Sequence, residues 1–182
     1  MLIAIQKKKE NIAEYLLYMW QVEDLIRAYA FDIDTIQQHI INQFDQSEQV
    51  KKQIRKWYEE LIEMMKAENV IQQNHLQINN NVIIGLTDLH LQLLKSPKES
   101  LYISTYYQTL PFIVELRSKA GNNQKGEIET CFSALYGVLL LKLQKKNITE
   151  NTQKAVQQIS KLLAILAEKY RADKEGTLEL LD

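Results

Sequence analysis

The chain has 182 residues, of which 46% are hydrophobic and 25% charged, and its formal net charge is −1. This composition is typical of a globular protein, and the near-balance of charges argues against the basic surface of most nucleic-acid-binding proteins. Five glycines and two prolines are too few for the many turns of a β-sandwich or barrel. A single cysteine, Cys131, excludes an internal disulfide and suits a reducing compartment, so we expect a cytoplasmic, all-α protein.

The sequence gives no indication of a membrane segment. Its apolar start is followed by Lys7, which is the reverse of the order in a secretory signal. The most apolar run, residues 131–143, is shorter than the roughly 20 residues that span a bilayer. We predict one helical-bundle domain over residues 1–172 and a loosely ordered C-terminal tail over residues 173–182.

Hydrophobic periodicity and capping residues predict a bundle of six to seven helices. Seven segments meet these criteria, at approximately residues 6–30, 34–44, 45–69, 75–95, 98–119, 127–146 and 149–170. The third begins with Asp45 and Glu48, which resemble a capping box. The fifth contains Pro111, which should kink or split it, and the seventh has Thr149 as its expected N-cap.

The segment 127–146 differs from the other six because its apolar side chains point in all directions. A helix that is apolar all round is normally buried on all sides. We therefore predict that it is the buried central helix of the bundle. Gly137, in its middle, would then permit a close helix crossing.

Several stretches resemble a Bacteroidetes family of small cytoplasmic proteins that is known only as a domain of unknown function. They are residues 8–27, 110–117, 127–132 and 135–140, and the resemblance extends over nearly the whole chain. It implies an all-helical fold and a gut-type bacterial source. It implies no reaction, ligand or catalytic residue.

No familiar catalytic or metal-binding motif is present. The sequence lacks a glycine-rich phosphate loop and a GxSxG nucleophile elbow. None of the histidines His39, His75 and His90 has an acidic residue three positions before it, as a ferritin-like di-metal site requires. One cysteine and three scattered histidines also argue against structural zinc. We predict no metal, no cofactor and no catalytic residue.

Four charged or titratable residues lie among apolar helix positions: Glu23, Arg27, His90 and Arg117. Glu23 precedes Arg27 by four residues, which favours an internal ion pair that fixes helix register. A polar ligand anchor and a surface pair are the alternatives. His90 and Arg117 are interpreted first as bonded core residues. If all four side chains meet at one cavity, they form an interhelical polar pocket.

The predicted helix 98–119 has more aromatic residues than one core face requires. They are Tyr102, Tyr106, Tyr107 and Phe112. Tyrosine is enriched in the cores of protein interfaces, so these residues form either an interface or ordinary core packing.

Three functions compete on this sequence. A non-catalytic interaction or structural protein, self-associating as a homodimer or binding another protein, fits best because no catalytic set is recognisable. A small-ligand-binding protein or an unrecognised enzyme with the interhelical polar pocket is the alternative. Nucleic-acid binding is the third, through Lys51, Lys52, Arg55 and Lys56. Near-neutral charge and the adjacent acidic residues Glu59, Glu60 and Glu63 disfavour it.

Overall fold

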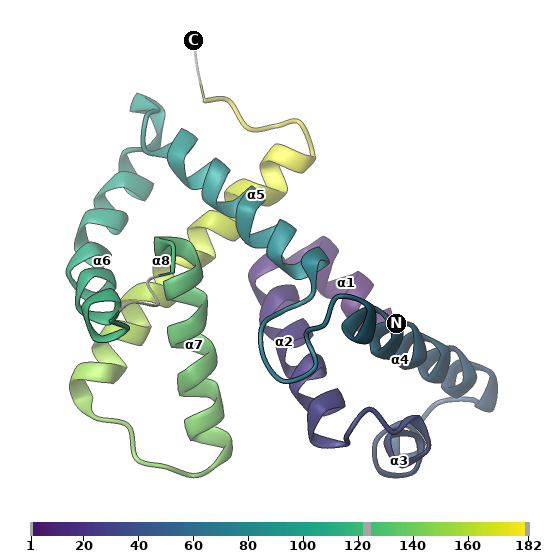
Figure 1. The fold of residues 1–182 in the computed structure, drawn as a ribbon. Helices are drawn as coiled ribbons and strands as arrows, with labels where there is room; N and C mark the ends of the chain where they lie inside the picture. Colours follow the sequence, from purple (N-terminus) through teal and green to yellow (C-terminus); the bar gives the residue numbers. More distant parts are fainter. Residues whose placement is uncertain (1, 122–124, 181–182) are drawn as a thin grey trace. The chain divides into compact units, whose positions relative to one another are not determined.

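A computed structural model describes residues 2–121 and 125–180, and all regular structure in these ranges is helical (Figure 1). The predicted all-α class is therefore confirmed. The α-helices are α1 (Leu2–Glu10), α2 (Ile12–Ala28), α3 (Ile33–His39), α4 (Glu48–Ala67), α5 (Gln77–Leu93), α6 (Ser100–Lys119), α7 (Glu127–Leu143) and α8 (Glu150–Lys174). Two short 3-10 helices, η1 (Ile41–Gln43) and η2 (Pro97–Glu99), precede α4 and α6.

Two predicted helices differ from the structure in their continuity. The expected first helix is divided at Asn11, whose side-chain Oδ1 accepts a hydrogen bond from the Ala13 amide at 3.0 Å. An asparagine side chain that binds its own backbone competes with the helical hydrogen bonds and starts a new helix instead. By contrast, α6 continues through Pro111, so the predicted split of this helix is wrong.

The helix caps explain where the clearest helices begin. Ser47 caps α4, because its side chain accepts a hydrogen bond from the Val50 amide. The predicted start at Asp45 is therefore wrong by two residues. The Thr149 cap of α8 is confirmed, since its hydroxyl accepts a hydrogen bond from the Thr152 amide.

The helices group into two compact units. Unit 1 contains the chain up to Glu10 and Glu14–Asn81, and unit 2 contains Asn11–Ala13 and the chain from Val82 onward. Helix α5 starts in unit 1 and ends in unit 2. The core of unit 1 is made by the fully buried side chains Leu16, Met19, Trp20, Ile26, Ile36, Ile41, Leu61, Met65 and Leu76.

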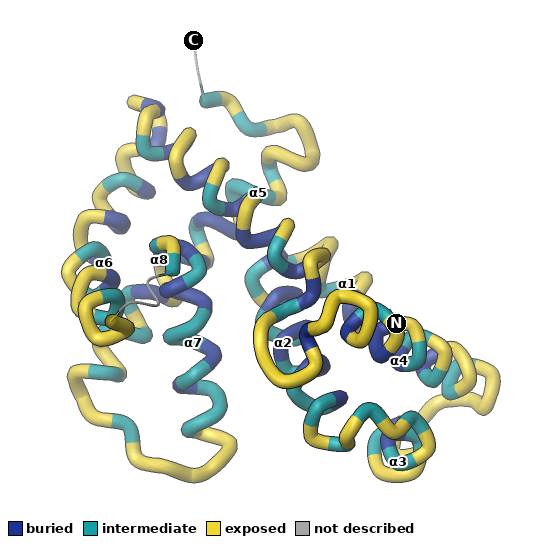
Figure 2. Tube along the Cα trace, in the orientation of Figure 1, coloured by how far each residue is buried: buried dark blue, intermediate teal, exposed yellow. Residues whose placement is uncertain are grey.

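In unit 2, helices α6, α7 and α8 pack against one another in all three pairings. Figure 2 shows buried positions along the inner sides of these helices and an exposed connection between α7 and α8. The fully buried side chains of this unit are Leu86, Leu93, Tyr102, Ile113, Ile128, Cys131, Phe132, Ile159, Leu162 and Leu166.

The prediction that the segment 127–146 is buried on all sides holds only in part, because the buried residues of α7 lie between Ile128 and Val138 and alternate with half-buried ones. Ile128 and Phe132 are fully buried, whereas Leu139 to Leu141 are half-buried and Leu143 is 67% exposed. A Cβ added at Gly137 would meet nothing within 4 Å. The predicted close helix crossing at Gly137 is therefore wrong, and the second half of α7 is a partly open wall.

The C-terminal region continues as helix beyond the predicted end at Tyr170, since α8 extends to Lys174. After it, the Leu180 carbonyl accepts a hydrogen bond of 2.7 Å from the hydroxyl of Ser96, which precedes η2. None of the helices in the described ranges has the length and apolarity that a membrane crossing requires.

Candidate functional site

Two networks of polar side chains, one in each unit, are joined by hydrogen bonds and ion pairs. We call them the Glu23 network, in unit 1, and the Glu127 cluster, in unit 2. Of the four residues predicted to form a polar pocket, Glu23 and Arg27 belong to the first, and His90 and Arg117 belong to the second.

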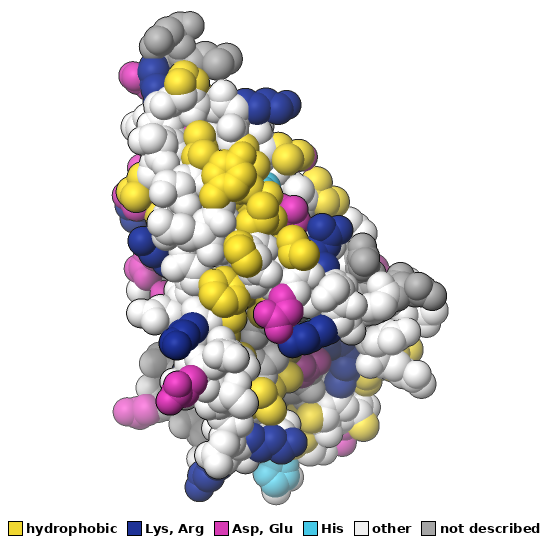
Figure 3. Space-filling view, turned by 90° about the vertical axis from the view of Figure 1, so that its left-hand side faces the viewer, with side chains coloured by type: hydrophobic (Ala, Val, Ile, Leu, Met, Phe, Trp, Pro, Cys, Tyr) yellow, Lys and Arg dark blue, Asp and Glu magenta, His cyan; other side chains and the backbone are white. Residues whose placement is uncertain are grey.

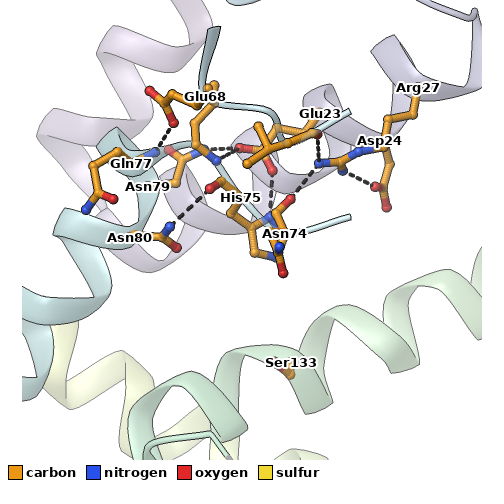
Figure 4. A network of polar contacts seen from close by, with 12 residues as sticks. Glu23, Asp24, Arg27, Glu68, Asn74, His75, Gln77, Asn79, Asn80 and Ser133 are labelled. Atoms are coloured by element: carbon orange, nitrogen blue, oxygen red, sulfur yellow. Dashed lines mark hydrogen bonds and ion pairs between the residues drawn. The ribbon is translucent and has the colours of Figure 1, made fainter. Parts of the chain in front are cut away.

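Glu23, on α2, is a fully buried carboxylate that accepts three hydrogen bonds (Figure 4). Its Oε1 accepts from the Leu76 amide at 3.0 Å and from Asn79 Nδ2 at 2.6 Å. Its Oε2 lies 2.6 Å from His75 Nδ1. The His75 ring stacks on Trp20, with ring centroids 4.1 Å apart and an interplanar angle of 7°. Both carboxylate oxygens thus have partners from one short stretch of chain.

These contacts hold the start of α5. The amides of Leu76 and Gln77 have no acceptor within the helix, as is normal at a helix N-terminus. Glu23 accepts from the first, and Glu68 Oε2 accepts from the second at 2.6 Å. Two carboxylates at this end also interact favourably with the helix dipole. The Glu23 network is therefore a helix cap assembled from distant parts of the chain.

Arg27 binds the connection between α4 and α5 through hydrogen bonds. Its Nη2 donates to the carbonyl oxygens of Val70 and Asn74, at 3.1 and 2.5 Å, and its Nη1 donates to Asp24 at 2.8 Å. Glu23 and Arg27 therefore have separate partners. The ion pair predicted between them is wrong, because Glu23 binds residues at the start of α5, whereas Arg27 binds Asp24 and two carbonyl oxygens of the α4–α5 connection.

The Glu127 cluster is made by α5, α6 and α7. His90 Nδ1 lies 2.6 Å from the Tyr102 hydroxyl, and His90 Nε2 lies 3.6 Å from Glu127 Oε2. Tyr106 donates to the same carboxylate oxygen at 3.0 Å, and Arg117 Nη1 lies 3.9 Å from Glu127 Oε1. His90 and Arg117 are thus brought to one acidic residue.

The protonation states in this cluster follow from burial. Burial lowers the pKa of His90, while the nearby Glu127 carboxylate acts in the opposite direction. Burial raises the pKa of Tyr102, so its hydroxyl stays protonated. A neutral imidazole favours placing its N–H rather than its lone pair toward the Glu127 carboxylate, and in that tautomer Nδ1 accepts from the Tyr102 hydroxyl. Burial also raises the pKa of Cys131 to about 12, which leaves a thiol that is a poor nucleophile.

The lowered pKa of His90 predicts a pH-dependent contribution to stability. Below its ordinary pKa of about 6.5, the unfolded chain binds a proton that the folded protein resists, so stability falls as the pH falls through that value. His90→Gln removes this proton. We expect the variant to be less stable than the native protein at pH 7.5 and the difference to shrink toward pH 5.5. Thermal unfolding midpoints of both proteins measure it, and parallel pH curves would contradict it.

The basic cluster on α4 and the candidate metal ligands are the remaining predictions. Arg55 pairs with Asp34 and Glu59, Lys51 with Glu48, and Lys56 with Glu60, so acidic partners neutralise most of the basic cluster on α4. Across residues 2–121 and 125–180, no three His, Cys, Asp or Glu side chains gather as a metal ion would require.

The four aromatic residues proposed for an interface separate by burial. Tyr102 and Tyr106 are buried in unit 2 and belong to the Glu127 cluster. Tyr107 is 64% exposed. Phe112 is half-buried and lines a groove between α6, α7 and α8.

An apolar stripe runs along the outer side of α6. We call it the α6 stripe and define it as Ile103, Tyr107, Leu110 and Val114. Tyr107 and Val114 are 64% and 56% exposed, and the other two are half-buried. Figure 3 shows hydrophobic side chains gathered in a band on the face that it views. Only Tyr107 of these four was predicted as an interface residue, although their spacing of four, three and four residues is visible in the sequence.

The similarity of the chain to known proteins is at the level of a protein family. No curated protein and no solved structure matches the chain. A family model described as a domain of unknown function, DUF4924, matches residues 1–177. Because this match covers nearly the whole sequence, the chain belongs to the DUF4924 family.

Proposed function

We propose that the chain is a non-catalytic helical interaction protein that forms a homodimer through the α6 stripe. The observation that carries this proposal is the row of exposed apolar side chains on α6, including Tyr107 and Val114. Exposed apolar rows on soluble proteins are commonly interaction surfaces. The buried carboxylate Glu23, whose oxygens are occupied by hydrogen-bond donors, has the character of a structural element rather than a catalytic one.

A second copy of the chain fits the stripe better than a charged partner does. From Ser100 to Val114, α6 contains no Asp, Glu, Lys or Arg, so like charges do not oppose one another when two copies pair. The spacing of the stripe also reads the same in both directions. In an antiparallel two-fold pair, Ile103 faces Val114 of the partner subunit, and Tyr107 faces Leu110 of the partner subunit. A two-fold interface requires such self-complementarity.

The size of the stripe sets the expected strength of the dimer. A helix of 20 residues is about 30 Å long, and one such helix buries less than the roughly 800 Å² per partner of a standard interface. We therefore expect a dissociation constant in the micromolar range.

Replacing Tyr107 with glutamate should break the dimer. The substitution places a charge at the centre of the apolar contact, and its desolvation should weaken association by more than about tenfold. Sedimentation equilibrium at about 5–200 μM, a range that includes the expected micromolar dissociation constant, measures the association. Leu143→Glu is the matched control, since Leu143 is 67% exposed on α7 and outside the stripe. A native protein that is monomeric throughout, or equal weakening by both substitutions, contradicts the proposal.

The resemblance to a Bacteroidetes family and the single cysteine support a bacterial, cytoplasmic setting for this dimer. Cell fractionation of the native host tests the location, and recovery of the chain in a membrane or secreted fraction would contradict it.

A further inference from the structure

The second half of α7 forms one wall of an open groove in unit 2, with α6 and α8 as the other walls. Its volume is about 810 Å³, within the range of 300–1,000 Å³ typical of small-ligand sites. The apolar residues that line it include Phe112, Leu116, Val138, Leu141, Val156 and Ile159. We propose that this groove binds an amphipathic anion, namely a hydrocarbon chain that ends in a carboxylate.

Gly137 is the first reason to assign a ligand to the groove. Glycine in the middle of a helix reduces stability by up to about 1 kcal/mol relative to alanine, so a helix wall normally avoids it. No neighbour explains it here, because a Cβ at Gly137 would meet nothing within 4 Å. Gly137 lines the groove, and its lack of a side chain lets an occupant approach the α7 backbone closely.

The charges at the rim determine the sign of the head group. The charged residues that line the groove are Glu115, Lys119 and Lys154, which leave one net positive charge. Lys119 Nζ pairs with Glu115 at 2.5 Å, whereas Lys154 has no ion pair within the described part of the chain. Lys154 is exposed at the groove, so its ammonium group can pair with a carboxylate bound there.

The start of α8 adds polar groups at the same rim. Thr149, Asn151 and Thr152 line the groove beside Lys154, and Thr149 is the N-cap of α8. The N-terminal end of a helix carries partial positive charge and so favours an anion nearby. Glu150, the acidic residue of this first turn, does not line the groove. The groove thus has an apolar floor and a lining with one net positive charge, and a fatty-acid-like molecule complements both features.

Dodecanoate, kept below its micelle concentration, is the probe. Isothermal titration of the full-length protein should show saturable binding with one site per chain. Dodecyltrimethylammonium has the same chain length and the opposite charge, so we expect it to bind at least about fivefold more weakly. Comparable affinity for the two probes would overturn the assignment of an anion, and the absence of saturable dodecanoate binding would overturn the site.

Two substitutions at Gly137 separate occupancy of the groove from effects on folding. Gly137→Leu fills the space over α7 and should weaken dodecanoate binding by about tenfold or more. Gly137→Ala improves helix propensity, adds one methyl group and should change the affinity by no more than about threefold. Circular dichroism establishes that both variants keep the native helix content. Equal affinity of native protein and Gly137→Leu would overturn the proposal.

Lys154→Gln tests the head group and should weaken dodecanoate binding about two- to fivefold.

Sedimentation of Gly137→Leu tests whether a second copy of the chain, rather than a ligand, occupies the groove. A changed association state would show that it does, and this result would also overturn the ligand assignment. Because the α6 stripe lies outside the groove lining, Tyr107→Glu should leave dodecanoate affinity unchanged. The groove and the dimer can therefore fail separately.

Discussion

Replacing Glu23 with alanine is expected to lower the free energy of unfolding by about 3–5 kcal/mol. The carboxylate is fully buried and accepts hydrogen bonds from the Leu76 amide and Asn79, with His75 as its third partner. Alanine leaves these groups without an acceptor, and each buried unsatisfied donor costs about 1–3 kcal/mol. The start of α5 also loses a negative charge that its dipole favours.

Tryptophan fluorescence provides a selective readout for this substitution. The chain has two tryptophans, Trp20 and Trp57, and both lie in unit 1. Urea unfolding followed by fluorescence should show a lower midpoint with an unchanged slope. Glu14→Ala is the matched control on the same helix, since Glu14 is exposed and pairs with Lys7, and it should cost less than about 1 kcal/mol. Equal midpoints for the two variants would show that the Glu23 network contributes no special stability.

The Glu23 network shows which features of the candidate site could be predicted from the sequence and which could not. The pattern along α2 correctly indicated that Glu23 sits among apolar residues. Its partners could not be inferred, because they lie 52 to 56 residues away and include a backbone amide. The same holds for Arg27, which binds two carbonyl oxygens 43 and 47 residues away. Periodicity identifies the buried positions of a helix, whereas the identity of a long-range partner depends on the tertiary structure that brings distant segments of the chain together.

Helices were predicted best where a local signal was strong. The Thr149 cap and the periodic face of α8 fixed the start of that helix, and few chain-breaking residues made an all-α fold the natural outcome. The burial of α7 was overestimated because its composition is apolar throughout, while its buried residues end at Val138. A sequence shows which side chains would gain from burial, but the extent of the covering helices is a tertiary property.

The partly exposed second half of α7 changes the functional interpretation of its sequence. Apolar residues such as Leu141 and the glycine at position 137 were first assigned to packing. In the structure they line the groove instead, where the same apolar character serves a ligand with a hydrocarbon chain. The α6 stripe is the parallel case, since Tyr107 and Val114 have the apolar character of core residues and the exposure of surface ones.

Truncation of Phe132 should have the second large effect, about 3–5 kcal/mol of lost stability for Phe132→Ala. Phe132 is fully buried in the first half of α7, in the core of unit 2, and alanine leaves a cavity that close packing cannot readily fill. Urea unfolding followed by circular dichroism at the helix band measures the loss.

Leu143→Ala is the control for Phe132, because it truncates another apolar residue of α7 that is 67% exposed. We expect it to change stability by less than about 0.5 kcal/mol. Similar losses at both positions would mean that Leu143 is buried in solution and that α7 is covered to its C-terminal end. The comparison of these two variants therefore tests how far the core of unit 2 extends along α7.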